Sequence, residues 1–145
     1  MTNIKIEFEK GGVFFARLLE DEAPKSCQAI LKHLNFEYEF KHSSTSGQAV
    51  VTLPSDFSME KENQRTIAIY PGSICFLVRD PVMRIPDEIY ITYGPYFISR
   101  GFRVDYQEPI NVIAKIDENL EELEKIGARF LKTGSEKVKF SKVED

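Results

Sequence analysis

The chain changes from a strand pattern to a helix pattern within the stretch Leu18-Leu19-Glu20-Asp21-Glu22-Ala23-Pro24-Lys25-Ser26. The run that begins at Val13 reads as a strand, and the acidic triplet ends it. Pro24 suits the first turn of a helix, which needs no amide hydrogen there, and the acidic residues before it favour the positive helix end. From Cys27 to Leu34 apolar residues recur at i, i+3, i+4 and i+7, so this stretch predicts a short amphipathic helix.

Alternation with a period of two predicts most of the remaining chain as strands. In residues 4–8, apolar side chains alternate with Lys5 and Glu7, and Gly11-Gly12 links this run to the next as a hairpin. Polar, glycine-containing or proline-containing turns separate the other strand-like runs. We expect these runs at 36–42, 48–53, 66–70, 73–78, 88–93, two within 96–106 broken at Gly101, 110–116, and a final hairpin of 128–132 and 136–140.

A second helix is predicted late in the chain. Asp117 follows the apolar run 110–116 and is an N-cap candidate, and Gly127 is a typical helix end, so we expect a helix over 118–126. Many short strands with turns between them favour a closed barrel, and two isolated helices fit over its open ends. The sequence therefore predicts a mainly β fold, a closed antiparallel β-barrel capped by two short helices, as a single domain over residues 1–145.

The stretch 18–26 is similar to the passage where cyclophilins carry an Ala-Pro-Lys-Thr element between a strand and a helix. The segments 70–74 and 110–116, the latter followed by an acidic helix, add to this resemblance, which spans nearly the whole chain. The sequence resembles a small family of uncharacterised bacterial and archaeal cyclophilin-like proteins more closely than the isomerases. The resemblance implies a cyclophilin-like barrel and a prokaryotic source, and it says less about activity.

Composition bounds the function. Hydrophobic residues make up 42% and charged residues 29% of the 145 residues, which is typical of a globular protein. The net charge of −4, without a cluster of Lys and Arg, argues against nucleic-acid binding. No apolar run is long enough to span a membrane, and residues 1–5 lack the apolar core of a signal peptide, so we expect a cytoplasmic protein. Cys27 and Cys75 lie among apolar neighbours without C-x-x-C spacing, which predicts buried thiols and neither metal nor cofactor.

Prolyl isomerisation needs a cationic donor that lowers a rotation barrier of about 18–20 kcal/mol. Cyclophilins place a Phe-His-Arg triplet on the strand after the first helix, where this chain has Phe40-Lys41-His42. A histidine therefore stands at the position that the resemblance gives to the arginine, and imidazole is a weaker constant cation than guanidinium. His42 is either a half-buried strand residue or part of a binding site.

The segment 91–103 concentrates aromatic residues, two arginines and two glycines. Aromatic walls with a few polar groups are typical of a small-molecule pocket, and Arg100 or Arg103 could hold a carboxylate through two parallel hydrogen bonds. The alternative is that Tyr93 and the other tyrosines fill the barrel wall while the arginines stay solvated. Asn111, in an apolar strand, needs buried partners, either in a neighbouring loop or in a ligand.

Three functions follow from these patterns. The first is a binding domain for a small carboxylate-bearing ligand or a peptide segment, with His42, Tyr93, Arg100, Arg103 and Asn111 as candidate site residues. The second is a divergent peptidyl-prolyl cis-trans isomerase. The third is a structural subunit that associates with copies of itself.

Overall fold

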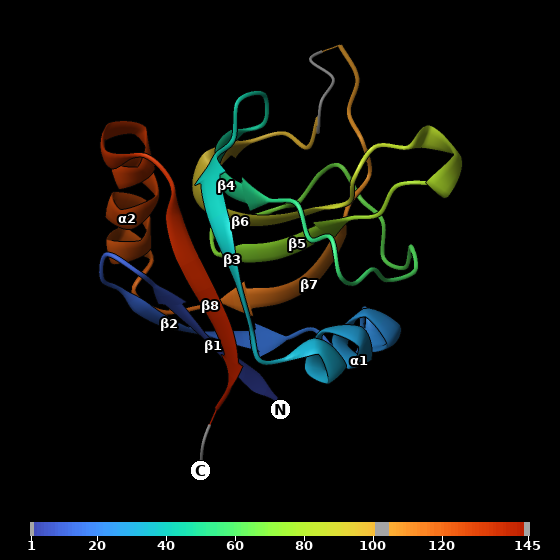
Figure 1. The fold of residues 1–145 in the computed structure, drawn as a ribbon, viewed down its shortest axis with the longest axis horizontal. Helices are drawn as coiled ribbons and strands as arrows, with labels where there is room; N and C mark the ends of the chain where they lie inside the picture. The colour runs from blue at the N-terminus through green and yellow to red at the C-terminus, as the bar shows by residue number, and fades with distance from the viewer. Residues whose placement is uncertain (1, 101–104, 144–145) are drawn as a thin grey trace.

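The computed structural model describes residues 2–100 and 105–143, and it shows a closed antiparallel barrel of eight strands with two α-helices (Figure 1). The strand order around the barrel is β1-β2-β7-β5-β6-β4-β3-β8, which confirms the predicted fold class. The strands are β1 (Asn3–Phe8), β2 (Val13–Leu18), β3 (Phe36–His42), β4 (Gly47–Thr52), β5 (Ser73–Leu77), β6 (Glu88–Phe97), β7 (Asn111–Ile116) and β8 (Glu136–Lys142). The helices are α1 (Pro24–His33) and α2 (Leu120–Thr133), with a short 3-10 turn, η1 (Pro81–Met83).

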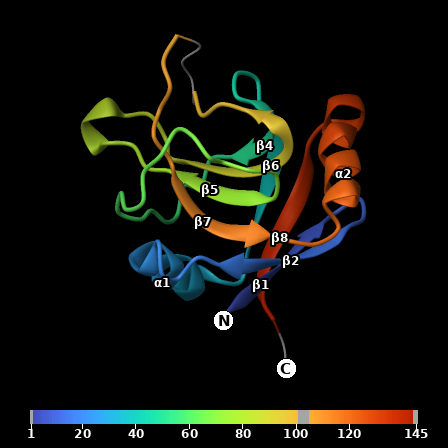
Figure 2. The ribbon, with the colours of Figure 1, turned by 180° about the vertical axis from the view of Figure 1, so that it is seen from behind.

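The two α-helices lie on opposite sides of the barrel, as Figures 1 and 2 show together. α1 contacts β7, whereas α2 contacts β3, β4 and β6. No helix among residues 2–100 and 105–143 is long and apolar enough to cross a membrane. Both cysteines are free and buried, as predicted, and burial raises the pKa of the Cys27 thiol to about 11 and that of Cys75 to about 12.

The second helix is longer than the sequence predicts. α2 continues through Gly127 to Thr133, so the expected strand over 128–132 is wrong and β8 has no partner there. Gly127 belongs to the buried face of the helix, where an added Cβ would lie 2.2 Å from the ring of Tyr93. The glycine thus allows α2 to approach β6 closely, and it does not end the helix.

One strand prediction in the middle of the chain is wrong, and another, 88–93, is confirmed but too short. Residues 66–70 form no strand; only Arg65, just before them, makes a single bridge with Ile110. β6 runs without a break from Glu88 to Phe97, although Gly94-Pro95 interrupts the alternation. The pairing of β4 with β6 shifts register between Gly47 and Ala49, and such an irregularity tolerates a proline without a ladder hydrogen bond.

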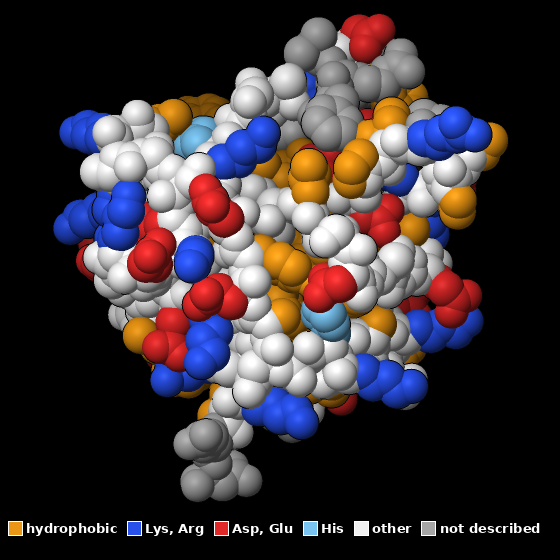
Figure 3. All heavy atoms as spheres, in the orientation of Figure 1, with side chains coloured by type: hydrophobic (Ala, Val, Ile, Leu, Met, Phe, Trp, Pro, Cys, Tyr) orange, Lys and Arg blue, Asp and Glu red, His pale blue; other side chains and the backbone are white. Residues whose placement is uncertain are grey.

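Apolar residues fill both faces of the strands β4, β5, β6 and β7. The larger cluster occupies the barrel interior and includes Val50, Ile74 and Ile89. The smaller cluster consists of residues that alternate with these along the strands, and so it lies on the outer face. Its members are Ala49, Val51, Cys75, Leu77, Tyr90, Ile110 and Val112. In the space-filling view of Figure 3, hydrophobic side chains lie at the base of a depression that charged side chains surround.

Candidate functional site

A cavity of about 380 Å³ opens beside the outer core, where the loop before β5, the segment after β5 and the segment before β7 meet. Its size is within the range of small-molecule sites. One side is apolar, and the other carries both positive and negative groups. The lining residues are Lys61, Gln64, Leu77, Val78, Arg79, Asp80, Ile85, Tyr106, Glu108 and Pro109.

Arg79 is the centre of a buried charged cluster at the edge of this cavity. Its Nε lies 2.8 Å from Glu108 Oε2, and its Nη2 lies 2.7 Å from Glu88 Oε2 and 3.1 Å from Glu108 Oε1. Nη1 donates to the carbonyl oxygen of Pro86 at 2.8 Å. The side chains of Arg79 and Glu88 are each 4% exposed, and that of Glu108 is 15% exposed. Glu108 is therefore the more exposed of the two carboxylates, and it lines the cavity together with Arg79, whereas Glu88 does not.

Burial would lower the pKa of Arg79, but the hydrogen bonds and charges of Glu108 and Glu88 outweigh it and hold this pKa above its ordinary value. The guanidinium is thus positively charged at neutral pH. Burial, together with the charge of Glu88, also raises the pKa of Tyr90, whose hydroxyl donates to Glu88 Oε1 at 2.6 Å. Two carboxyl groups share one guanidinium here, so ionisation of both gives the cluster an excess negative charge.

The cluster is linked to the turn between β3 and β4. The hydroxyl oxygens of Tyr90 and Ser46 are 3.4 Å apart, and the backbone N–H of Arg100 donates to Ser46 Oγ at 3.1 Å. The Arg100 guanidinium donates to the Thr45 carbonyl oxygen at 3.3 Å. The candidate residue Arg100 is therefore connected to Glu88 through Ser46 and Tyr90.

His42 and Tyr93 lie together on the inner side of the sheet. The Tyr93 hydroxyl is 2.6 Å from His42 Nε2, and His42 Nδ1 is 2.8 Å from the carbonyl oxygen of Ser43. Because a carbonyl can only accept, Nδ1 carries the proton and Nε2 accepts from the tyrosine. Tyr93 is 4% exposed, and burial, with the charge of Glu124, raises its pKa. Both ring nitrogens of His42 therefore have partners within the chain.

Asn111 is fully buried and joins three segments of the chain. Its Oδ1 accepts from the Glu62 backbone N–H at 3.0 Å and from Gln64 Nε2 at 2.8 Å. Its Nδ2 donates to Ser26 Oγ at 3.2 Å and to the Glu60 carbonyl oxygen at 2.9 Å. All four hydrogen-bonding positions of the amide are occupied, so the side chain holds the loop 60–64 against α1 and β7.

The structure does not gather the predicted site residues around one cavity. His42 and Tyr93 contact each other on the inner side, Arg100 is linked to the outer cluster, and Asn111 binds a loop. Arg103 lies outside the described residues. Among the residues that are described, no group of three or more His, Cys, Asp or Glu side chains is placed to hold a metal ion.

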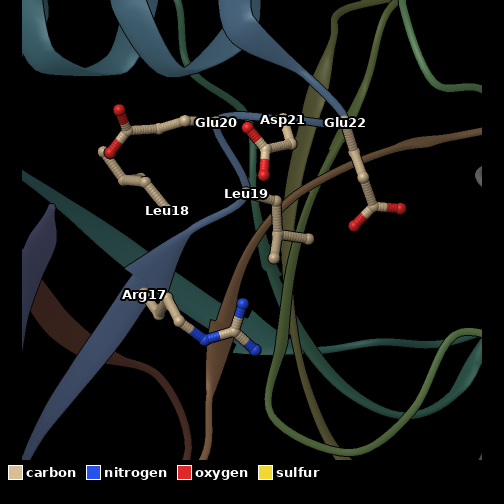
Figure 4. Close-up of a pocket in the computed structure, with 6 residues that line it drawn as sticks. All are labelled: Arg17, Leu18, Leu19, Glu20, Asp21 and Glu22. Carbon is tan, nitrogen blue, oxygen red and sulfur yellow. The ribbon is translucent and has the colours of Figure 1, made fainter. Parts of the chain in front are cut away.

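Another cavity, of about 370 Å³, lies at the strand-to-helix passage and is lined by residues 17–22 (Figure 4). The three acidic side chains there point in different directions, and Glu20 accepts from the Thr2 backbone N–H at 3.1 Å. Arg17 donates to Asp117 through Nε at 2.9 Å and Nη2 at 3.3 Å. The charged groups of this passage are thus directed to separate partners, and they do not converge on one ligand.

Sequence reasoning missed Arg79, Glu88 and Glu108. The alternation of Glu88, Tyr90 and Thr92 with isoleucines was a usable signal, because it places a carboxylate on the same face as a tyrosine of a buried strand. Arg79 and Glu108 are in irregular segments, and no spacing rule brings two such positions together.

The chain belongs to DUF3830, a family of proteins of unknown function, whose model matches residues 6–142. No curated protein matches the chain. A structure of McbB in complex with tryptophan is similar, with a TM-score of 0.74 and 18% identity, over 98% of this chain and 46% of McbB. The solution structure of the hypothetical protein AF2241 from Archaeoglobus fulgidus matches with a TM-score of 0.66 and 19% identity, over 98% of this chain and 95% of that one. These similarities support the barrel fold, and the cyclophilin resemblance stays a prediction.

Proposed function

We propose that this protein, a member of a family of unknown function, binds a small zwitterion of amino-acid type in the cavity beside Arg79. The observation that carries the proposal is the position of Glu108. Its carboxylate lines the cavity, while the guanidinium that pairs with it is shared with the more deeply buried Glu88. A ligand ammonium group beside Glu108 balances the excess negative charge of the cluster.

Lys61 is suited to hold the carboxylate of the same ligand. It lines the cavity, and its Nζ is 3.3 Å from Asp80 Oδ1. The side chains of this ion pair are 46% and 65% exposed, so the pair contributes little and Lys61 can turn to another carboxylate. The carboxylate-bearing ligand that the sequence predicts is therefore retained, at a different place in the fold.

The remaining wall selects for an apolar side chain on the ligand. Leu77, Val78, Ile85 and Pro109 line the cavity. Burial of apolar ligand surface against them supplies affinity but does not fix the orientation of the ligand. The backbone N–H of Arg100, and not its side chain, is linked to Glu88 through Ser46 and Tyr90, so the arginine has no assigned role in the proposal. A structurally similar protein, McbB, has a structure in complex with tryptophan. Tryptophan carries an ammonium group, a carboxylate and an apolar indole, the three groups that this cavity could bind. The chain spans about half of McbB, and the proposal takes from it only a choice of probe.

The test uses three indole compounds measured by calorimetry: L-tryptophan, tryptamine, which has no carboxylate, and indole-3-propionate, which has no ammonium group. We expect L-tryptophan to bind most tightly and each analogue at least about tenfold more weakly, equivalent to about 1.4 kcal/mol. Glu108→Gln should weaken tryptamine binding and leave indole-3-propionate unchanged. Lys61→Gln should do the reverse.

Glu39→Gln, on the exposed side of β3, is the matched control and should change none of the affinities. Equal affinity of all three compounds for the unmodified protein, or binding of none of them, would show that the cavity does not recognise an aromatic zwitterion. The structure gives no specific support to prolyl isomerisation, because His42 Nδ1 already donates to Ser43 and Nε2 receives a proton donor.

A further inference from the structure

We propose that the outer face of β2 is the interface of a two-fold symmetric dimer of this chain. The proposal is independent of the ligand site. Val13, the first residue of β2, and Phe15, two residues further on, project from this face and are 48% and 52% exposed. Both are large apolar side chains on a strand, and they lie side by side with Lys5 and Glu7 of β1 in the antiparallel register. Exposed apolar side chains inside a charged surface are typical of a contact site.

Two hollows lie on either side of Phe15, one acidic and one basic. The acidic hollow, of about 520 Å³, is lined by Phe15, Val13, Arg17, Asp117 and Glu118 among others. Arg17 and Asp117 form a bidentate ion pair, which leaves the negative charge of Glu118. Figure 2 shows the chain entering α2 beside β2 at this place.

The basic hollow, of about 670 Å³, is lined by Phe15, Lys5, Glu7, Lys139 and Lys142 among others. Lys5 and Glu7 are 3.4 Å apart and offset each other, so among the lining residues the charges of Lys139 and Lys142 remain, with Glu37 of β3 opposite Lys139 in the register. Both lysines are exposed on β8. A positive hollow thus lies next to a negative one on this face of a chain whose net charge is −4.

A two-fold axis beside Phe15 makes this face self-complementary. In an isologous interface every contact occurs twice, because the two copies use the same surface. The basic hollow of each copy therefore covers the acidic hollow of the other, once on each side of the axis. Phe15 and Val13 of the two copies then lie at the centre, where they are removed from water. The arrangement closes with two chains, because each copy uses the same surface that it presents.

The first measurement is the mass of the protein by light scattering on a gel-filtration column between 5 and 200 μM. We expect twice the chain mass of 16.7 kDa at the upper concentrations, and the mass of one chain for Phe15→Ser at all of them. Phe15 is half exposed, so its replacement leaves the core intact. A single-chain mass for the unmodified protein at 200 μM would overturn the proposal, and so would a dimer that Phe15→Ser leaves unchanged.

Charge reversal tests the pairing of the hollows. Variant A is Glu118→Lys, which makes both hollows basic, and variant B is Lys139→Gln with Lys142→Glu, which makes both acidic. We expect each variant alone to be at least tenfold weaker in self-association and an equimolar mixture of A and B to form a heterodimer. All three positions are exposed, and circular dichroism confirms that each variant is folded. Homodimers of A or B as stable as the original, or a mixture that stays monomeric, would show that the hollows do not face each other.

Discussion

Two buried polar clusters of this barrel differ in how completely they are satisfied. Asn111 is neutral, and its four hydrogen-bonding positions are all filled by Glu62, Gln64, Ser26 and Glu60. Arg79 also has partners on each of its three nitrogens, but its two carboxylate partners exceed its charge and one of them faces a cavity. The first arrangement is complete without a ligand, whereas the second offers a carboxylate to the ammonium group of the ligand that we propose.

The difference separates structural from functional polar groups without reference to any relative. A buried amide with every position filled stabilises one arrangement of the chain. A buried ion cluster with an excess charge is costly to the fold and gains from a counter-ion, so it marks a place where binding is favourable.

The largest effect is expected for Arg79→Met. Removal of the guanidinium leaves Glu88 and Glu108 buried without a cation, and we expect a loss of about 3–5 kcal/mol in the free energy of unfolding in urea. Arg17→Met, which removes an ion pair whose side chains are 36% and 50% exposed, should cost at most about 1 kcal/mol. If the two variants lose the same stability, the burial of the Arg79 cluster has no energetic weight. Adding Glu88→Gln and Glu108→Gln to Arg79→Met should restore part of the loss.

A smaller effect is expected for Asn111→Ala. The substitution leaves the groups of the loop 60–64 and of Ser26 without their partner, and we expect a loss of about 2–3 kcal/mol. Ligand affinity should fall as well, because the loop that loses its support carries Lys61 and Gln64, which line the cavity. Gln28→Ala, an exposed amide on α1, is the control and should change stability by less than about 0.5 kcal/mol. Equal stability of Asn111→Ala and the unmodified protein would show that the filled amide does not stabilise the fold.

The smallest effect is the pH dependence of the exposed pair. The hydrogen bond from Arg17 holds the pKa of Asp117 below its ordinary value, so the folded state favours the carboxylate. This stability is present above the unfolded pKa of about 3.9 and is lost as the pH falls through the lower folded pKa. We expect Asp117→Asn to lower the free energy of unfolding by less than about 1 kcal/mol at pH 7. Urea titrations of both proteins at one concentration should converge between pH 4 and pH 2, and a constant difference would exclude the ion pair as its source.

The fold was predictable where the pattern was local. Alternating residues identified β1 and β3, an apolar run identified β7, and Pro24 marked the start of α1. The errors come from tertiary contacts. From the sequence Gly127 is a typical helix end, but in the structure it is needed because the ring of Tyr93 occupies the space that a Cβ would fill. The continuation of β6 through Pro95 likewise depends on a register shift in its partner strand. Neither contact is visible in a single sequence.

The candidate site was less predictable than the fold. His42 and Tyr93 are on two strands that the sequence predicts in one barrel. Whether both side chains face inward and touch depends on the strand register, which the sequence does not show. Arg79 and Glu108 are 29 positions apart in irregular segments, and only the closed barrel brings them together. Glu88 was the one member with a local signal, because it alternates with buried isoleucines.

The first turn of α1 is capped by a residue that is distant in the sequence. Its N-cap residue, Ala23, has no side-chain cap, and the backbone N–H groups of Lys25 and Ser26 donate instead to the Glu62 carboxylate, at 3.1 and 2.9 Å. A helix of ten residues is marginal on its own. The entropy of closing the intervening chain must therefore be met before the helix gains its cap, so we expect α1 to form late in folding. We also expect the first amides of α1 and those of residues 60–64 to open together in native-state hydrogen exchange.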